Sequence, residues 1–266
     1  MLLRELDYAR PGSVEEAVKL LSGREDARAL AGGQSLVNVM KTRVASPELV
    51  VDLNRIESLR GIEAQDGALG IGAMTTYTAI LDSPEVAAAR PILAQVARTI
   101  ADVQVRNRGT IGGNVCSNDP TNHFPPLLAA IGAELTIVSA DGERSVGTDE
   151  FFEGVYLTAV RPGELLTHVR IPAKGEARDG WASLTLGEDG TGIVNVAASV
   201  SGSTARIAIG CVAATPVVVT ASADETAVKD AVRSANLDPP ADVHASADYR
   251  RHLAEVLAAR AVREAA

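Results

Sequence analysis

Apolar and polar positions follow two different periods along this chain, which indicates a mixture of helices and strands. Residues 14–21 repeat apolar side chains at helical spacing, and Ser13 with Glu16 forms a capping box at the start of that helix. Short aliphatic runs between turn residues predict strands, the second and third of them around the turn 65–67. These strands cover residues 27–31, 49–53 and 68–73, and further helices are predicted at 35–43, 75–82, 86–102 and 124–131.

The second half of the chain predicts more sheet. Residues 134–140 and 143–146 form a hairpin over Asp141-Gly142, and residues 165–172 form another strand. The charged, glycine-bearing stretch from Ala173 to Asp179 marks a domain boundary. Beyond it the pattern predicts a small α+β lobe, residues 175–266, with a three-stranded antiparallel sheet. Its strands are 182–186, 194–200 and 205–211, followed by helices at 223–234 and 246–264.

Composition excludes several classes of function. A formal net charge of −9 over 266 residues argues against nucleic acid as a partner, which would need clustered cations. The most apolar stretch, residues 127–137, is interrupted by Gly132 and Glu134 and is too short to span a bilayer. The start of the chain does not resemble a signal peptide. We therefore expect a soluble, cytoplasmic protein without membrane insertion.

Two cysteines, Cys116 and Cys211, are too few for a zinc site or an iron–sulfur cluster within this chain. No Ser–His–Asp, Cys–His or paired-carboxylate arrangement stands out, so hydrolytic chemistry is not expected. We predict no catalytic side chain and no metal ligand in this chain. Buried thiols in a reducing cytoplasm explain the two cysteines.

Two glycine loops carry the functional signal. Residues 31–35 read Ala-Gly-Gly-Gln-Ser, and residues 110–114 read Thr-Ile-Gly-Gly-Asn. Glycine lets the backbone approach a ligand closely, and successive amides at a turn or helix start form a cradle for an anion. A single Gly-Gly pair is usually only a turn. Two such loops could hold both phosphates of a dinucleotide from opposite sides.

The stretch Gln104–Asn114 resembles a signature of the flavin-binding medium subunits of molybdenum hydroxylases, the xanthine dehydrogenase and aerobic carbon monoxide dehydrogenase family. Residues 31–36 are similar to the other signature of that family. The similarity continues, in order, through residues 71–76, 151–156, 161–166 and 245–251. It therefore spans nearly the whole chain.

The resemblance implies a two-subdomain FAD-binding fold (PCMH/vanillyl-alcohol-oxidase-like) in residues 1–174, with subdomains of about 1–58 and 59–174. Residues 175–266 would form the C-terminal flavoprotein lobe that helps cover the flavin. It also implies two partner subunits: a large one with the molybdenum cofactor and a small one with two [2Fe–2S] clusters, together forming a dimer of heterotrimers. The flavin subunit would pass electrons on to NAD, oxygen, a quinone or another carrier.

Site residues follow from the resemblance position by position. The pyrophosphate of FAD would contact both glycine loops, Leu166 would pack near the flavin ring, and Thr75 and Thr76 are weaker candidates. His123 stands where the family often has an aspartate that reaches the adenosine ribose. The loop residues are Ala31, Gly32, Gly33, Gln34 and Ser35 on one side, and Thr110, Ile111, Gly112, Gly113 and Asn114 on the other.

The sequence leaves alternatives open for three residues and for the function of the whole chain. His123 could be a ribose contact, a covalent flavin anchor or a surface residue, of which we favour a non-covalent contact or no role. Arg106 and Arg108 could steer the cofactor or form an ion pair with Asp102. The chain as a whole could be a nucleotide-binding scaffold or regulatory module without redox turnover, or a self-contained flavin oxidase. An oxidase would need its own acid or base in a substrate pocket, and the sequence offers none.

Overall fold

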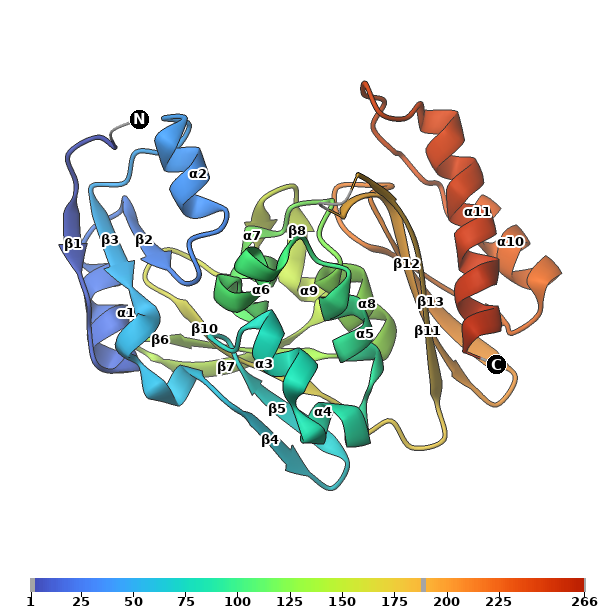
Figure 1. The fold of residues 1–266 in the computed structure, drawn as a ribbon, viewed down its shortest axis with the longest axis horizontal. Coiled ribbons are helices and arrows are strands. Elements are labelled where there is room, and N and C mark those ends of the chain that lie inside the picture. Colours follow the sequence, from blue (N-terminus) through green and yellow to red (C-terminus); the bar gives the residue numbers. More distant parts are fainter. Residues whose placement is uncertain (1–2, 188–189, 266) are drawn as a thin grey trace.

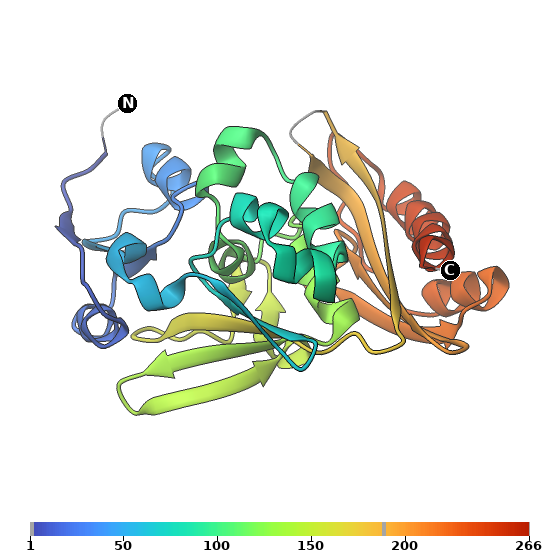
Figure 2. The same cartoon turned by 60° about the horizontal axis from the view of Figure 1, so that its bottom comes forward.

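The computed structural model describes residues 3–187 and 190–265. Three main sheets follow one another along the chain, from the N-terminal part through the middle to the C-terminal part (Figure 1). Helices α3 to α8 lie over one face of the middle sheet, and the C-terminal sheet stands beside them (Figure 2). None of the helices in the described ranges combines the length and the apolar character needed to cross a membrane.

The first sheet is parallel, in the order β1-β3-β2, with β1 at Asp7–Ala9, β2 at Ala27–Leu30 and β3 at Leu49–Asp52. Helix α1 (Val14–Ser22) packs Ala17, Val18 and Leu21 against it. Ser13 caps this helix as predicted, whereas the Glu16 carboxylate accepts a hydrogen bond from the Gly12 amide (2.9 Å) instead of closing the box on Ser13. Helix α2 (Leu36–Lys41) follows β2, and two 3-10 turns, Leu53–Arg55 and Glu57–Leu59, follow β3.

The middle sheet is antiparallel, in the order β4-β5-β10-β6-β7. The strands predicted at residues 49–53 and 68–73 both form, but they belong to different sheets. The strand that pairs with β5 across the turn 65–67 is β4, which was not predicted, because its residues are mostly exposed at the sheet edge and so carry little apolar pattern. The bounds are β4 Ile62–Gln65, β5 Ala68–Gly72, β6 Glu134–Ser139, β7 Gly142–Gly147 and β10 Leu165–Ile171; α9 (Thr148–Phe151) and the pair β8 (Phe152–Gly154) and β9 (Leu157–Thr158) lie between β7 and β10.

Six helices connect β5 to β6, and the prediction of one helix over residues 86–102 is wrong. Residues 86–102 do not form a single helix, because Pro91 lacks an N–H and disfavours a helical conformation at Arg90, whose φ is −153° and ψ is 75°. The chain forms α4 and α5 there, and then α6, which the sequence pattern did not reveal. The helices are α3 Tyr77–Asp82, α4 Pro84–Ala89, α5 Ile92–Arg98, α6 Val103–Arg108, α7 Ile111–Ser117 and α8 Phe124–Ile131.

The C-terminal sheet has four antiparallel strands, not the three predicted, in the order β11-β12-β13-β14. The missed strand, β14 (Val217–Ser222), starts directly after Pro216 and forms a half-exposed edge, so its alternation is weak. The others are β11 Arg178–Leu186, β12 Thr191–Ser201 and β13 Thr204–Gly210. Helices α10 (Glu225–Arg233) and α11 (Ala247–Glu264) cover the outer face (Figure 1).

The inner face of the C-terminal sheet packs on the middle of the molecule. Trp181, Ala197 and Ala208 from this sheet belong to the same buried cluster as Phe124 and Leu127 of α8. A buried ion pair adds to this contact: the Arg90 guanidinium donates two hydrogen bonds of 2.8 Å to Asp179. Both side chains are less than 5% exposed. The C-terminal part is therefore fixed against the helices that surround the glycine loops.

Arg250 of α11 is buried although it is charged. Its guanidinium donates to the carbonyl oxygen of Ile193 and to the carboxylate of Asp242 (2.7 Å). The first of these hydrogen bonds links helix α11 to β12.

Candidate cofactor site at the two glycine loops

The two glycine loops are brought into direct contact. A Cβ atom placed on Gly32 would lie 2.0 Å from the carbonyl oxygen of Arg108, and one placed on Gly113 would lie 3.6 Å from the Cβ atom of Ala31. The first loop leaves the carboxyl end of β2, while the second begins helix α7. The sequence predicted both loops, and the structure places them side by side.

Local hydrogen bonds position the second loop. Thr110 caps α7, with its hydroxyl accepting from the amide of Gly113 (3.0 Å). The amide of Ile111 donates to the Thr75 carbonyl (3.0 Å), and that of Gly112 to the Ala73 carbonyl (2.9 Å). Gly112 also needs its small size, because a Cβ atom there would lie 2.6 Å from Ala73. The loop is therefore anchored to the segment after β5.

The first loop keeps its amides free. Within the described part of the chain, the amides of Gly32, Gly33, Gln34 and Ser35 find no protein acceptor. Gly33 has a φ of +76°, which favours glycine and directs the backbone around the turn. Ser35 stands at the start of α2 but makes no capping hydrogen bond, and its hydroxyl has no hydrogen-bond partner among residues 3–187 and 190–265. The Gln34 side chain turns back to the Gly32 carbonyl (3.1 Å).

The amides of the second loop, unlike those of the first, are hydrogen-bonded within the protein. The amides of Ile111, Gly112 and Asn114 are each bonded to a backbone carbonyl, and that of Gly113 is bonded to Thr110. A ligand would therefore not meet a row of free amides here. Its available polar group is the Asn114 Oδ1 atom, which is buried and has no partner among the described residues. An orphaned buried acceptor is costly, and a hydroxyl donor from a ligand would satisfy it.

A cavity of about 270 Å³ lies at the first loop. Its polar lining consists of the loop backbone, Asn38 and two cations, Lys41 and Arg108. Lys41 was not predicted as a site residue, although a basic residue in the last turn of the helix after the loop is a signal in the sequence. Arg108 does not pair with Asp102, whose carboxylate caps α6 by accepting from the Val105 amide (2.8 Å). The full lining is Leu30, Ala31, Gly32, Gly33, Gln34, Val37, Asn38, Lys41 and Arg108.

His123 lies away from the first loop, directly before α8. It is 4% exposed, which excludes a surface residue. Its ring meets that of Trp181 edge-on, with centroids 5.5 Å apart, and its Nε2 atom has no partner among the described residues. Burial lowers the pKa of His123 to about 4, so the imidazole is neutral at ordinary pH. The Trp181 Nε1 atom is unpartnered as well.

The remaining candidates have structural contacts. The Thr75 hydroxyl donates to the Gly61 carbonyl (3.0 Å), and the Thr76 hydroxyl accepts from the Ala79 amide at the start of α3 (3.2 Å). Thr76 and Thr110 also form an isolated antiparallel bridge. Leu166 on β10 is buried in the main apolar core and does not line the cavity at the first loop. Its proximity to a flavin ring stays a prediction.

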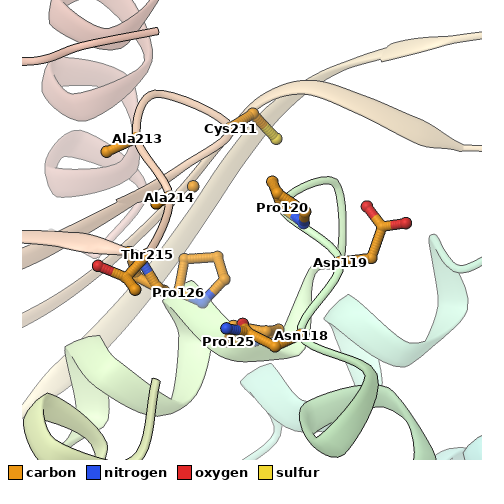
Figure 3. A pocket seen from close by; sticks show the side chains of 11 residues that line it. Asn118, Asp119, Pro120, Pro125, Pro126, Cys211, Ala213, Ala214 and Thr215 are labelled. Atoms are coloured by element: carbon orange, nitrogen blue, oxygen red, sulfur yellow. The ribbon is translucent and has the colours of Figure 1, made fainter. Parts of the chain in front are cut away.

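A second cavity lies between the loop before α8 and the turn after β13 (Figure 3). Asn118, Asp119 and Pro120 face Cys211 and Thr215 across it. Its volume is about 10 Å³, enough for one water molecule and too small for a cofactor. Burial raises the pKa of the Cys211 thiol to about 12, so this cysteine is not a reactive thiolate.

Comparison with known proteins identifies the family. Residues 4–174 match the model of the FAD binding domain in molybdopterin dehydrogenase. The chain is 40% identical to the carbon monoxide dehydrogenase medium chain of Afipia carboxidovorans, covering 100% of this chain and 98% of that one. It is 34% identical to the glyceraldehyde dehydrogenase medium chain of Sulfolobus acidocaldarius, over 98% and 99% of the two chains.

Solved structures agree with this result. A chain of the reconstituted CO dehydrogenase from Oligotropha carboxidovorans superimposes with a TM-score of 0.93 at 37% identity, covering 100% of this chain and 99% of that one. The match therefore extends through the C-terminal sheet and helices, beyond the FAD-binding domain. The chain belongs to the family of FAD-binding medium subunits of molybdenum hydroxylases, the family that includes the carbon monoxide dehydrogenase medium chains.

Proposed function

We propose that this chain takes electrons from the [2Fe–2S] clusters of a partner subunit and passes them to an external acceptor through bound FAD. The observation that carries this proposal is the contact between the two glycine loops, with a cavity of about 270 Å³ beside them. Both loops come from the part of the chain that matches the FAD-binding domain, residues 4–174.

The residues present fit a dinucleotide. The free amides of Gly33, Gln34 and Ser35 can donate to phosphate oxygens, and the Ser35 hydroxyl can add a further hydrogen bond. Across the junction, Asn114 Oδ1 can accept from a ligand hydroxyl. When bound, FAD supplies the electron-accepting and electron-donating chemistry that no side chain of the protein can supply. The chain binds and orients the cofactor and excludes water from it.

His123 and Leu166 complete the proposed site. The neutral imidazole of His123 offers Nε2 for a non-covalent hydrogen bond at the junction with the C-terminal sheet. Leu166 would contribute apolar contact near the flavin ring. Thr75 and Thr76 act by holding the second loop in place, since both hydroxyls are already bonded within the protein.

The partners follow from the family. Medium chains such as the relatives above belong to multisubunit enzymes, so this chain has large and small subunit partners. We propose that these carry the molybdenum cofactor and two [2Fe–2S] clusters, and that the complex is a dimer of heterotrimers in the cytoplasm. The division into 1–174 and 175–266, with subdomains of about 1–58 and 59–174, is supported by a family match that ends at residue 174. A nucleotide-binding scaffold without redox turnover has no comparable support.

An absorption spectrum tests the proposal. The chain is purified with its co-expressed partner subunits, and any chromophore is released with acid and identified. We expect FAD that becomes reduced when substrate is given to the whole complex. A colourless complex containing both partners would rule out the flavoprotein function. Bound nucleotide without a reducible chromophore would favour the scaffold instead.

A further inference from the structure

The cavity at the first glycine loop is positively charged in an acidic protein. The chain carries a formal net charge of −9, yet the two ionisable side chains that line this cavity are Lys41 and Arg108. No Asp or Glu is among the residues that line the cavity. Two cations that line one cavity without a carboxylate favour an anion there.

These two cations reach the cavity from different elements. Lys41 is the last residue of α2, and Arg108 is the last residue of α6, two residues before Thr110. Gly32 lies against the backbone of Arg108, and the first loop lines the same cavity as Lys41 and Arg108. Cations and amides therefore converge on one space, although they come from segments far apart in the sequence.

The second loop offers fewer free donors than the first. Three of its four amides after Thr110 are bonded to backbone carbonyls, and the fourth is bonded to the Thr110 hydroxyl. Its glycines allow close approach to Ala73 and Ala31. The free backbone donors for a bound diphosphate therefore lie on the side of the first loop.

We infer that Lys41 and Arg108 bind the diphosphate of FAD, together with the free amides of residues 32–35. This inference rests on the proposed function and assigns the charge recognition within that site. A diphosphate bridge carries two negative charges, which matches two cations. Lysine supplies a compact point charge, while the arginine fork can hold two oxygens at once. The site thus selects a ligand with a diphosphate over a nucleoside without one.

Equilibrium binding tests the inference. The complete complex is stripped of flavin and titrated with FAD, using the change in flavin fluorescence, at 50 and 500 mM salt. We expect Lys41→Met and Arg108→Met each to raise the dissociation constant for FAD about tenfold. The double variant should raise it about 100-fold, because charge-assisted hydrogen bonds are lost. Raising the salt should weaken binding to the wild type more than to the double variant.

Competition gives a second readout. ADP should displace FAD from the wild type much better than adenosine does, and the double variant should lose this difference. Arg43→Met is the matched control: Arg43 lies two residues after Lys41 in the sequence, is exposed, and does not line the cavity. It should bind FAD within twofold of the wild type.

Three outcomes would overturn the inference. The first is FAD binding within twofold of the wild type in both single variants. The second is wild-type binding that does not change with salt, a result that does not depend on any variant folding. The third is equal competition by ADP and adenosine in the wild type. A wild-type complex that binds no FAD under any condition would instead refute the proposed function, so the two failures are distinguishable.

Discussion

Replacing Gly32 by alanine should separate the two glycine loops. The added Cβ atom would lie 2.0 Å from the Arg108 carbonyl oxygen and 2.7 Å from its carbon, whereas real Cβ atoms essentially never come closer than 3.0 Å to another heavy atom. The backbone must therefore open by about 1 Å. Both sides of the contact are main chain, so no rotamer change can relieve the overlap.

The magnitude follows from this displacement. Overpacking of this kind typically costs about 1–3 kcal/mol of stability. A ligand that needs both loops also loses hydrogen-bond geometry when they part, and we expect the dissociation constant for FAD to rise about 100-fold, or about 2.7 kcal/mol. Because Gly32 does not have a positive φ, the loss would be steric rather than conformational.

The assay compares FAD titration and thermal unfolding of the wild type, Gly32→Ala and Gly70→Ala. Gly70 is the matched control, since a Cβ atom there would meet nothing within 4 Å and its φ is not positive. Gly70→Ala should behave like the wild type in both measurements. If Gly32→Ala kept wild-type FAD affinity and an unchanged melting temperature, the close contact between the loops would be needed neither for FAD binding nor for stability.

Three further predictions test other parts of the site and its support. Gly33→Val and Gly113→Val should both expel FAD: at Gly33 a branched side chain would enter the cavity, and at Gly113 it would press on the Thr110 hydroxyl and on Ala31 of the first loop; retention of FAD at wild-type affinity in both, measured by acid release, would contradict the two-loop site. The pKa of His123 is lowered by burial from 6.5 to about 4, so the unfolded chain binds its proton first and stability falls as pH falls from about 6.5 to about 4, by about 3 kcal/mol in total. Denaturant unfolding should show a smaller fall over that range in His123→Gln, and identical pH profiles would refute the assignment. Arg90→Met should cost about 3–5 kcal/mol, because it leaves the Asp179 carboxylate buried without a partner. The double variant Arg90→Met with Asp179→Leu should recover much of this loss, and an equal or larger loss in denaturant unfolding would count against the buried-charge explanation.

Local signals in the sequence predicted much of the chain correctly. Helix α8 spans the predicted residues 124–131, and Ser13 caps α1 as predicted. Capping, proline restriction and turn formation depend on hydrogen bonds and sterics within a few residues, so they can be read without the fold. The same locality explains the errors. Strands β4 and β14 lie at sheet edges, where exposure removes the apolar alternation that identifies a strand.

The sequence by itself determined that two glycine loops exist, in which order they occur and which family they resemble. Only the tertiary structure decided which groups they present. It bonded the amides of the second loop within the protein, left those of the first loop free, and brought Lys41 and Arg108 to one cavity. It also buried His123 against Trp181 and Arg250 against β12. These outcomes join residues far apart in the chain, and they depend on how whole sheets and helices pack, which no short stretch of sequence specifies.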